Sequence, residues 1–66
     1  MDKAVAAGIL DVISNEIQAK YDRYERVRKL DGKGIDKREK EVVAYKIEAL
    51  KTGAHCLRNV AQAEKG

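Results

Sequence analysis

Near the middle of the chain stands the stretch Asp31-Gly32-Lys33-Gly34-Ile35-Asp36-Lys37-Arg38-Glu39. Gly32 can adopt the left-handed backbone conformation that commonly ends a helix. Asp36 and Glu39 have the spacing of a capping box, in which Asp36 is the N-cap of the following helix. The stretch therefore predicts that one helix ends, that a turn occupies residues 31–35, and that a second helix begins.

Both sides of this turn have helical periodicity, with apolar residues at three- and four-residue steps. The first set is Ala6, Leu10, Ile13, Ile17, Tyr24 and Val27, and the second is Val43, Ile47, Leu50, Ala54, Leu57 and Ala61. No Pro interrupts either segment. We therefore expect one all-α domain over residues 1–66, in which helices at about 3–30 and 37–63 form an antiparallel hairpin.

The apolar surface is wider than two paired helices can bury. The second helix carries a further stripe of Val42, Ala49, Gly53, Cys56 and Val60, and the first helix carries Val5, Ile9, Val12 and Leu30. Such surface favours association. We expect a homo-oligomeric helical bundle, in which Ala49 and Gly53 let helices approach closely. The alternative for Gly53 is that it only weakens its helix.

The composition argues against several classes of protein. The sequence has 66 residues, with one Cys, one His and no Pro. Cys56 has no partner for an internal disulfide or a zinc site, and no apolar run is long enough to span a membrane. The acidic residues near the start are atypical of a secretory signal. Without a triad or a phosphate loop, we expect a cytoplasmic binding protein, not an enzyme, with no metal or cofactor.

Positive charge gathers around the turn. Residues 20–40 hold nine bases and five acids, a net charge of +4. A basic end of this kind attracts phosphates. The alternative is an ordinary solvated helix end with pairs such as Asp22–Arg26.

Lys20 lies within the apolar arc of the first helix and Lys46 within that of the second, at about the same level of the hairpin. They would repel each other and lose solvation unless an anion or a carboxylate meets them. Neighbouring tyrosines offer stacking surfaces for a base. The candidate ligand-binding residues at this level are Lys20, Arg23, Tyr24, Tyr45 and Lys46. The alternative is that Glu16 pairs with Lys20 while the lysine stems cover apolar surface.

A second candidate cluster lies on the polar face of the second helix. It consists of Lys51, Thr52, His55 and Arg58. Two bases, an imidazole and a hydroxyl suit a phosphate or a ribose. An ordinary solvated face explains the same residues equally well.

The segment from Ala44 to Val60 resembles the C-terminal helix of a phage helical-hairpin family. The resemblance rests on Lys46-Ile47-Glu48, on Leu50-Lys51-Thr52-Gly53, and on Leu57, Arg58 and Val60. That family consists of the cyclic-nucleotide sponges that counter the CBASS and Thoeris antiphage systems. This chain departs from the family because its first aromatic residue, Tyr21, comes late in the first helix.

The resemblance implies a non-enzymatic phage anti-defence protein that acts by immune evasion in the infected bacterial cell. Such proteins sequester cyclic dinucleotides, cyclic trinucleotides or cyclised ADP-ribose in pockets between subunits, often as hexamers. By position, the resemblance assigns ligand contacts to Lys46, Thr52, Gly53 and Arg58. Two other hypotheses stay open. A dimeric hairpin could bind RNA through its basic face, or the exposed stripe could dock on a host protein and inhibit it.

Overall fold

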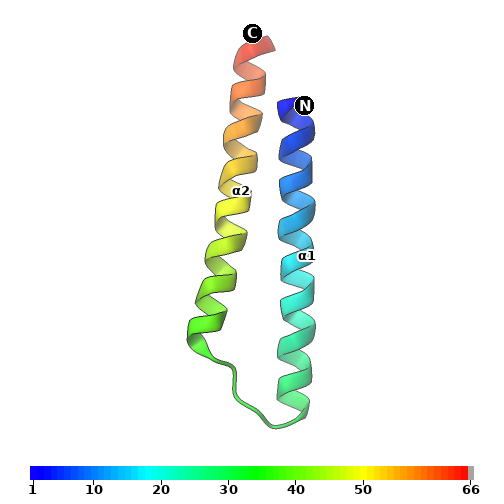
Figure 1. Cartoon of the computed structure of the whole chain (residues 1–66), viewed down its shortest axis with the longest axis vertical. Helices are drawn as coiled ribbons and strands as arrows, with labels where there is room; N and C mark the ends of the chain where they lie inside the picture. Colours follow the sequence, from blue (N-terminus) through cyan, green and yellow to red (C-terminus); the bar gives the residue numbers. More distant parts are fainter. Residues whose placement is uncertain (66) are drawn as a thin grey trace.

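The computed structural model describes residues 1–65. Gly66, the last residue of the predicted domain, lies outside the described residues. Helices α1, Lys3–Leu30, and α2, Lys37–Lys65, run antiparallel, with both termini at one end and the turn at the other (Figure 1). This confirms the all-α hairpin and the predicted limits of α1. Helix α2 begins where predicted and continues two residues past the expected end at 63.

The turn has the conformation that its glycine predicts. Gly32 has φ 71°, and its N–H donates to the Lys29 carbonyl at 3.1 Å. The Lys33 N–H donates to the Arg28 carbonyl at 2.9 Å. These two bonds are those of a Schellman motif, which satisfies carbonyls that the helix end leaves free.

Aspartates cap the N-termini of both helices. Asp36 Oδ1 accepts from the Arg38 N–H at 3.0 Å, so Asp36 is the predicted N-cap of α2. The Glu39 carboxylate instead faces α1, with Oε2 3.5 Å from the Tyr24 hydroxyl, the outer limit of a hydrogen bond. Asp2 caps α1 by accepting from the Ala4 N–H at 2.8 Å, a cap that was not among the predictions from sequence.

The predicted contact face of α2 is confirmed. Ile47 and Ala54 are buried, and the other four members of the set are half-buried. On α1 the predicted face is confirmed only in part, for Ala6, Leu10 and Ile17, which are half-buried. Ile13, Tyr24 and Val27 are 38%, 37% and 56% exposed.

The residues of α1 that are buried against α2 are instead Ala7, Ser14 and Tyr21, at seven-residue spacing. Leu10 and Ile17 are half-buried beside them. Ser14 is the polar residue of this row. Its burial is tolerated because its Oγ donates to the Asp11 carbonyl at 2.8 Å. A seven-residue row is the seam that two nearly parallel helix axes present to each other.

The distance between the helices follows the size of the buried side chains. The ribbons lie closer together toward the termini, where Ala7 and Ala54 are buried, than toward the turn, where Tyr21 is buried (Figure 1). A Cβ added to Gly53 would lie 3.3 Å from Leu10 Cδ1, so this glycine permits close approach inside the hairpin.

Two ion pairs across the hairpin show its register. Lys3 pairs with Glu64, and Arg58 pairs with Asp11. In exposed positions, such pairs contribute little to stability. Their value here is to show which levels of α1 and α2 meet.

Much of the second apolar surface is exposed. Val5 and Val12 are each 55% exposed on α1, and Val42 and Val60 are each 45% exposed on α2. Cys56 is also exposed. Within residues 1–65, neither helix is apolar enough over a sufficient length to cross a bilayer.

Candidate functional site

Two tyrosines of α1 meet near the turn. The ring centroids of Tyr21 and Tyr24 lie 5.9 Å apart, with their planes inclined at 41°. This spacing is within the range of favourable aromatic pairs. Tyr21 points to α2, and Tyr24, three residues later, lies beside it on the same flank of α1. The two rings therefore form an aromatic wall along one flank of the hairpin.

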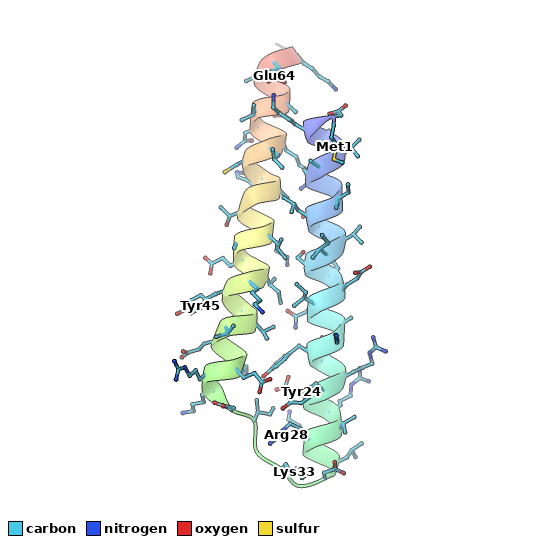
Figure 2. The ribbon with its side chains drawn as sticks, viewed as in Figure 1. Met1, Tyr24, Arg28, Lys33, Tyr45 and Glu64 are labelled. Atoms are coloured by element: carbon cyan, nitrogen blue, oxygen red, sulfur yellow. The ribbon has the colours of Figure 1, made fainter. Side chains whose placement is uncertain are left out.

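Arg28 extends this wall toward the turn. Its guanidinium carbon lies 5.5 Å from the centre of the Tyr24 ring, a cation–π distance. Its Nε donates to the Gly34 carbonyl at 2.9 Å, which ties the turn to α1. Figure 2 shows Tyr24 and Arg28 together at the turn end of the molecule.

An open recess of about 270 Å³ lies beside the tyrosines. It is lined by Ile17, Lys20, Tyr21, Tyr24, Glu39 and Val43. Its walls are mainly aromatic and aliphatic, and one amine and one carboxylate are the charged groups among the lining residues. Such a surface suits a planar ring that carries a charged substituent.

The Tyr21 hydroxyl is a buried polar group in this region. Among the described residues it has no hydrogen-bond partner. Burial raises the pKa of this hydroxyl above its usual value, and the negative charges of Glu25 and Glu39 raise it further. Tyr21 therefore carries a neutral hydroxyl at physiological pH, and that hydroxyl lacks an acceptor.

The structure brings together only part of the first predicted cluster. Lys20 and Tyr24 line the same recess. Lys46 and Arg23 are exposed, and neither lines that recess. Tyr45 is 66% exposed and points away from α1 (Figure 2). Within one chain, Tyr45 is therefore not part of the aromatic wall.

The second predicted cluster is exposed along α2. Lys51 and Thr52 are exposed, and His55 Nε2 lies 3.2 Å from Asn59 Nδ2. Arg58 pairs with Asp11 of α1. Arg58 therefore already has an anionic partner, which makes it less available to a phosphate than Lys51.

Sequence reasoning did not select three residues that shape the recess. Tyr21 was placed near the lysines but not among the ligand-binding residues, and Glu39 was interpreted only as a capping residue. Arg28 was counted only as part of the positive charge. One signal could have found it, because Tyr24 and Arg28 are four residues apart and hence neighbours on a helix face.

Comparison of the chain with family models, curated proteins and solved structures finds no match. Within residues 1–65, no three His, Cys, Asp or Glu side chains gather as a metal site requires. The features of this chain that bear on function are therefore the recess, the charges around it and the exposed apolar surface.

Proposed function

We propose that this chain is a non-enzymatic, homo-oligomeric binding protein that sequesters a small cyclic nucleotide. The observation that carries the proposal is the recess in which Lys20 stands beside Tyr21 and Tyr24. An amine can neutralise a phosphate, and an aromatic wall can stack a base. The surrounding residues 20–40, with a net charge of +4, favour an anion over a neutral ring.

The exposed apolar surface supports the oligomeric part of the proposal. The recess is open within one chain, and exposed valines continue along both helices. A second subunit that covers this surface would close the recess and exclude water from it. Lys46 follows Glu39 by seven residues on α2 and so faces the same flank as the recess. In an assembly it can contact a ligand that Lys20 also contacts.

The resemblance of α2 to the phage sponges supplies the class of ligand. Cyclic dinucleotides, cyclic trinucleotides and cyclised ADP-ribose each combine phosphates with flat bases. By withholding such a signal, the protein would protect an infecting phage from CBASS or Thoeris defence in the bacterial cytoplasm.

Calorimetric titration with a panel of these cyclic nucleotides tests the proposal. We expect saturable binding at a fixed ratio per subunit, with linear analogues binding much more weakly. Lys20→Gln removes a charge-assisted contact and should weaken binding by about ten- to a hundredfold. Lys46→Ala should also abolish tight binding, with the oligomer intact by light scattering.

Lys65→Gln is the matched control, because it removes the same charge at the far end of the hairpin and should leave binding unchanged. No binding of any member of the panel would contradict the proposal. Affinity for RNA that falls steeply with salt and rises with RNA length would instead favour the RNA-binding alternative.

A further inference from the structure

One flank of the hairpin carries exposed apolar side chains interspersed with charged ones, and we call it the apolar flank. The recess identifies this flank, since Lys20 and Tyr24 of α1 meet Glu39 of α2 there. Residues seven positions apart share a helix face. Ile13 and Val27 therefore lie in line with Lys20, and both are exposed.

The opposite flank has a polar rim. There, a smaller recess has Tyr21, Val43, Ala44 and Ile47 among its lining residues, and Gln18, Glu25 and Lys40 line it as well. The Arg58–Asp11 ion pair continues the same line toward the termini, because Asp11, Gln18 and Glu25 are seven residues apart. Only the first flank is suited to burial against another protein.

Six exposed residues of α1 form a regular row on the apolar flank. They are Ile9, Ile13, Glu16, Lys20, Arg23 and Val27. Alternating steps of four and three residues are the spacing of a coiled-coil seam. Two copies of this row match when the helices run in opposite directions. Glu16 of one copy is then level with Lys20 of the other, and the two end residues, Ile9 and Val27, are both apolar.

We propose that α1 packs along this row against α1 of a second copy of the chain, antiparallel, about a two-fold axis level with residue 18. Glu16 of each copy then meets Lys20 of the other, and Ile9 meets Val27. The two-fold symmetry makes each contact twice, as an isologous interface requires.

Two further contacts extend the seam. Arg23 lies beside Ile13 of the other copy, which the aliphatic stem of the arginine can cover. Ala6 comes level with Leu30 of the other copy, which would bury a side chain that is 87% exposed in the single chain.

The charges select this register over its neighbours. An antiparallel seam keeps its rows facing each other only when it shifts by whole heptads. A shift in one direction sets Lys20 against Arg23, two like charges. A shift in the other direction sets Ile13 against Glu16 and Ile9 against Lys20. Only the register centred on residue 18 pairs opposite charges and keeps Ile9 and Val27 in apolar contact.

The same two-fold axis places α2 of one subunit beside α2 of the other, and the residue nearest the axis is small. The Lys3–Glu64 pair fixes the register of the hairpin and places residue 18 of α1 level with Ala49 of α2. Ala49 is exposed, and Val42 and Val60 are exposed on either side of it. A small residue near the axis lets the two α2 helices approach, while the valines pack on both sides.

The dimer also completes the recess, since Tyr24 and Lys20 become level with Val12 and Glu16 of the second copy. Its seam holds two acids and four bases. Glu16 pairs with Lys20, so Arg23 of each copy is the base that has no acid opposite it and is free to meet a phosphate. This inference rests on the proposed function only in its expectation of self-association, and it needs no nucleotide.

Complementary charge-reversal variants test the contact between copies. Glu16→Lys gives a chain with two bases at these positions, and Lys20→Glu gives a chain with two acids. Each variant alone should self-associate at least about tenfold more weakly than the natural chain, because like charges face each other. An equimolar mixture should form heterodimers, measured by sedimentation and native mass spectrometry.

The mixture isolates the contact between copies, since neither variant retains an ion pair between positions 16 and 20 within its own helix. Circular dichroism of each variant confirms that the hairpin still forms. Lys40→Glu is the matched control on the opposite flank and should leave association unchanged. Failure of the mixture to prefer heterodimers would overturn the proposal.

Single cysteines, introduced with Cys56→Ser, test the antiparallel direction. A chain with Ile9→Cys and a chain with Val27→Cys should each stay uncrosslinked under mild oxidation, since like positions lie about 27 Å apart on antiparallel helices. Mixing them should give a mixed disulfide. Crosslinking of either variant to itself would show a parallel seam and overturn the proposal.

The outcomes for the two proposals are distinguishable. Mixed disulfides without nucleotide binding would support this dimer and contradict the sponge function. Nucleotide binding by an oligomer that lacks the mixed disulfide would support the sponge function and contradict this dimer.

Discussion

Tyr21 fills the wide part of the hairpin near the turn at the cost of an unsatisfied hydroxyl. Its ring is buried against α2 and packs at a tilt against the Tyr24 ring, while its oxygen is enclosed without a partner among the described residues. The ring contributes apolar burial to a small core, whereas the desolvated hydroxyl opposes folding. Glu25 and Glu39 nearby disfavour its ionised form further.

Replacing Tyr21 by Phe should therefore increase the free energy of unfolding at neutral pH, because the ring stays and the unpaired hydroxyl is removed. The pKa of the Tyr21 hydroxyl is raised on folding above its ordinary value of 10.0. Above about pH 10 the hydroxyl opposes folding still more, since it ionises in the unfolded chain before it ionises in the folded one.

Urea denaturation between pH 7 and pH 11 checks this prediction. Stability should fall less between pH 7 and pH 11 for Tyr21→Phe than for the natural chain, because the variant has no hydroxyl to ionise at this position. Tyr45→Phe is the control, because that side chain is 66% exposed and its loss should leave stability at neutral pH unchanged. A Tyr21→Phe chain less stable than the natural protein at pH 7 would show that the hydroxyl has a partner.

At the scale of the element, α1 presents two different faces. One carries Ala7, Ser14 and Tyr21 and is buried against α2. The other carries exposed Ile9 and Val27, together with three charged residues. Small residues on the first face let the two helices pack closely toward the termini, and the second face is free to meet another molecule.

Substituting Leu for Ala7, which has no exposed surface, should destabilise the hairpin by about 1–3 kcal/mol. The added side chain must separate α1 from α2 or adopt a strained rotamer. Ala4→Leu is the matched control, because Ala4 is exposed and its replacement should change stability by no more than about 0.5 kcal/mol. Equal effects in chemical denaturation would contradict the orientation of α1 described above.

At the scale of the whole molecule, the chain is a thin rod measuring 54 × 17 × 14 Å. Its buried residues are Ala7, Ser14, Tyr21, Ile47 and Ala54 among the described part of the chain. Three of these five are alanine or serine, so one hairpin buries little apolar area. A chain of this size seldom reaches useful stability without a further source of burial.

The thermal midpoint of the natural protein should consequently rise with protein concentration, by about 5 °C per tenfold for a folded dimer in equilibrium with unfolded chains. Differential scanning calorimetry over a hundredfold range of concentration measures the slope. Glu16→Lys should reduce the midpoint at every concentration. A midpoint that does not change with concentration would show that a single hairpin is stable alone.

Local sequence determined much of the fold because its signals act over a few residues. Gly32 and Asp36 predicted the helix end and the new helix start, and the apolar row of α2 predicted its contact face. These signals depend on backbone conformation and on near neighbours, which any chain with this sequence shares.

The rotation of α1 was decided only by the tertiary structure. Its apolar arc is wide, so many rotations bury similar area, and the choice falls to the size of the side chains at the contact. Ala7, Ser14 and Leu10 fit close to α2 near Gly53, whereas Ile13 stays 38% exposed. Hydrophobicity is a property of each residue alone, whereas packing depends on how the side chains of the two helices fit together.

The recess likewise needed the tertiary structure. The sequence placed Lys20 and Tyr24 near one level, but it did not separate them from Tyr45, which points away from α1. Glu39 and Tyr24 come from different helices and meet only once the hairpin has closed. Sequence by itself determined which side chains lie along each helix, and the tertiary structure decided which of them share a surface, because that depends on how two helices are rotated against each other.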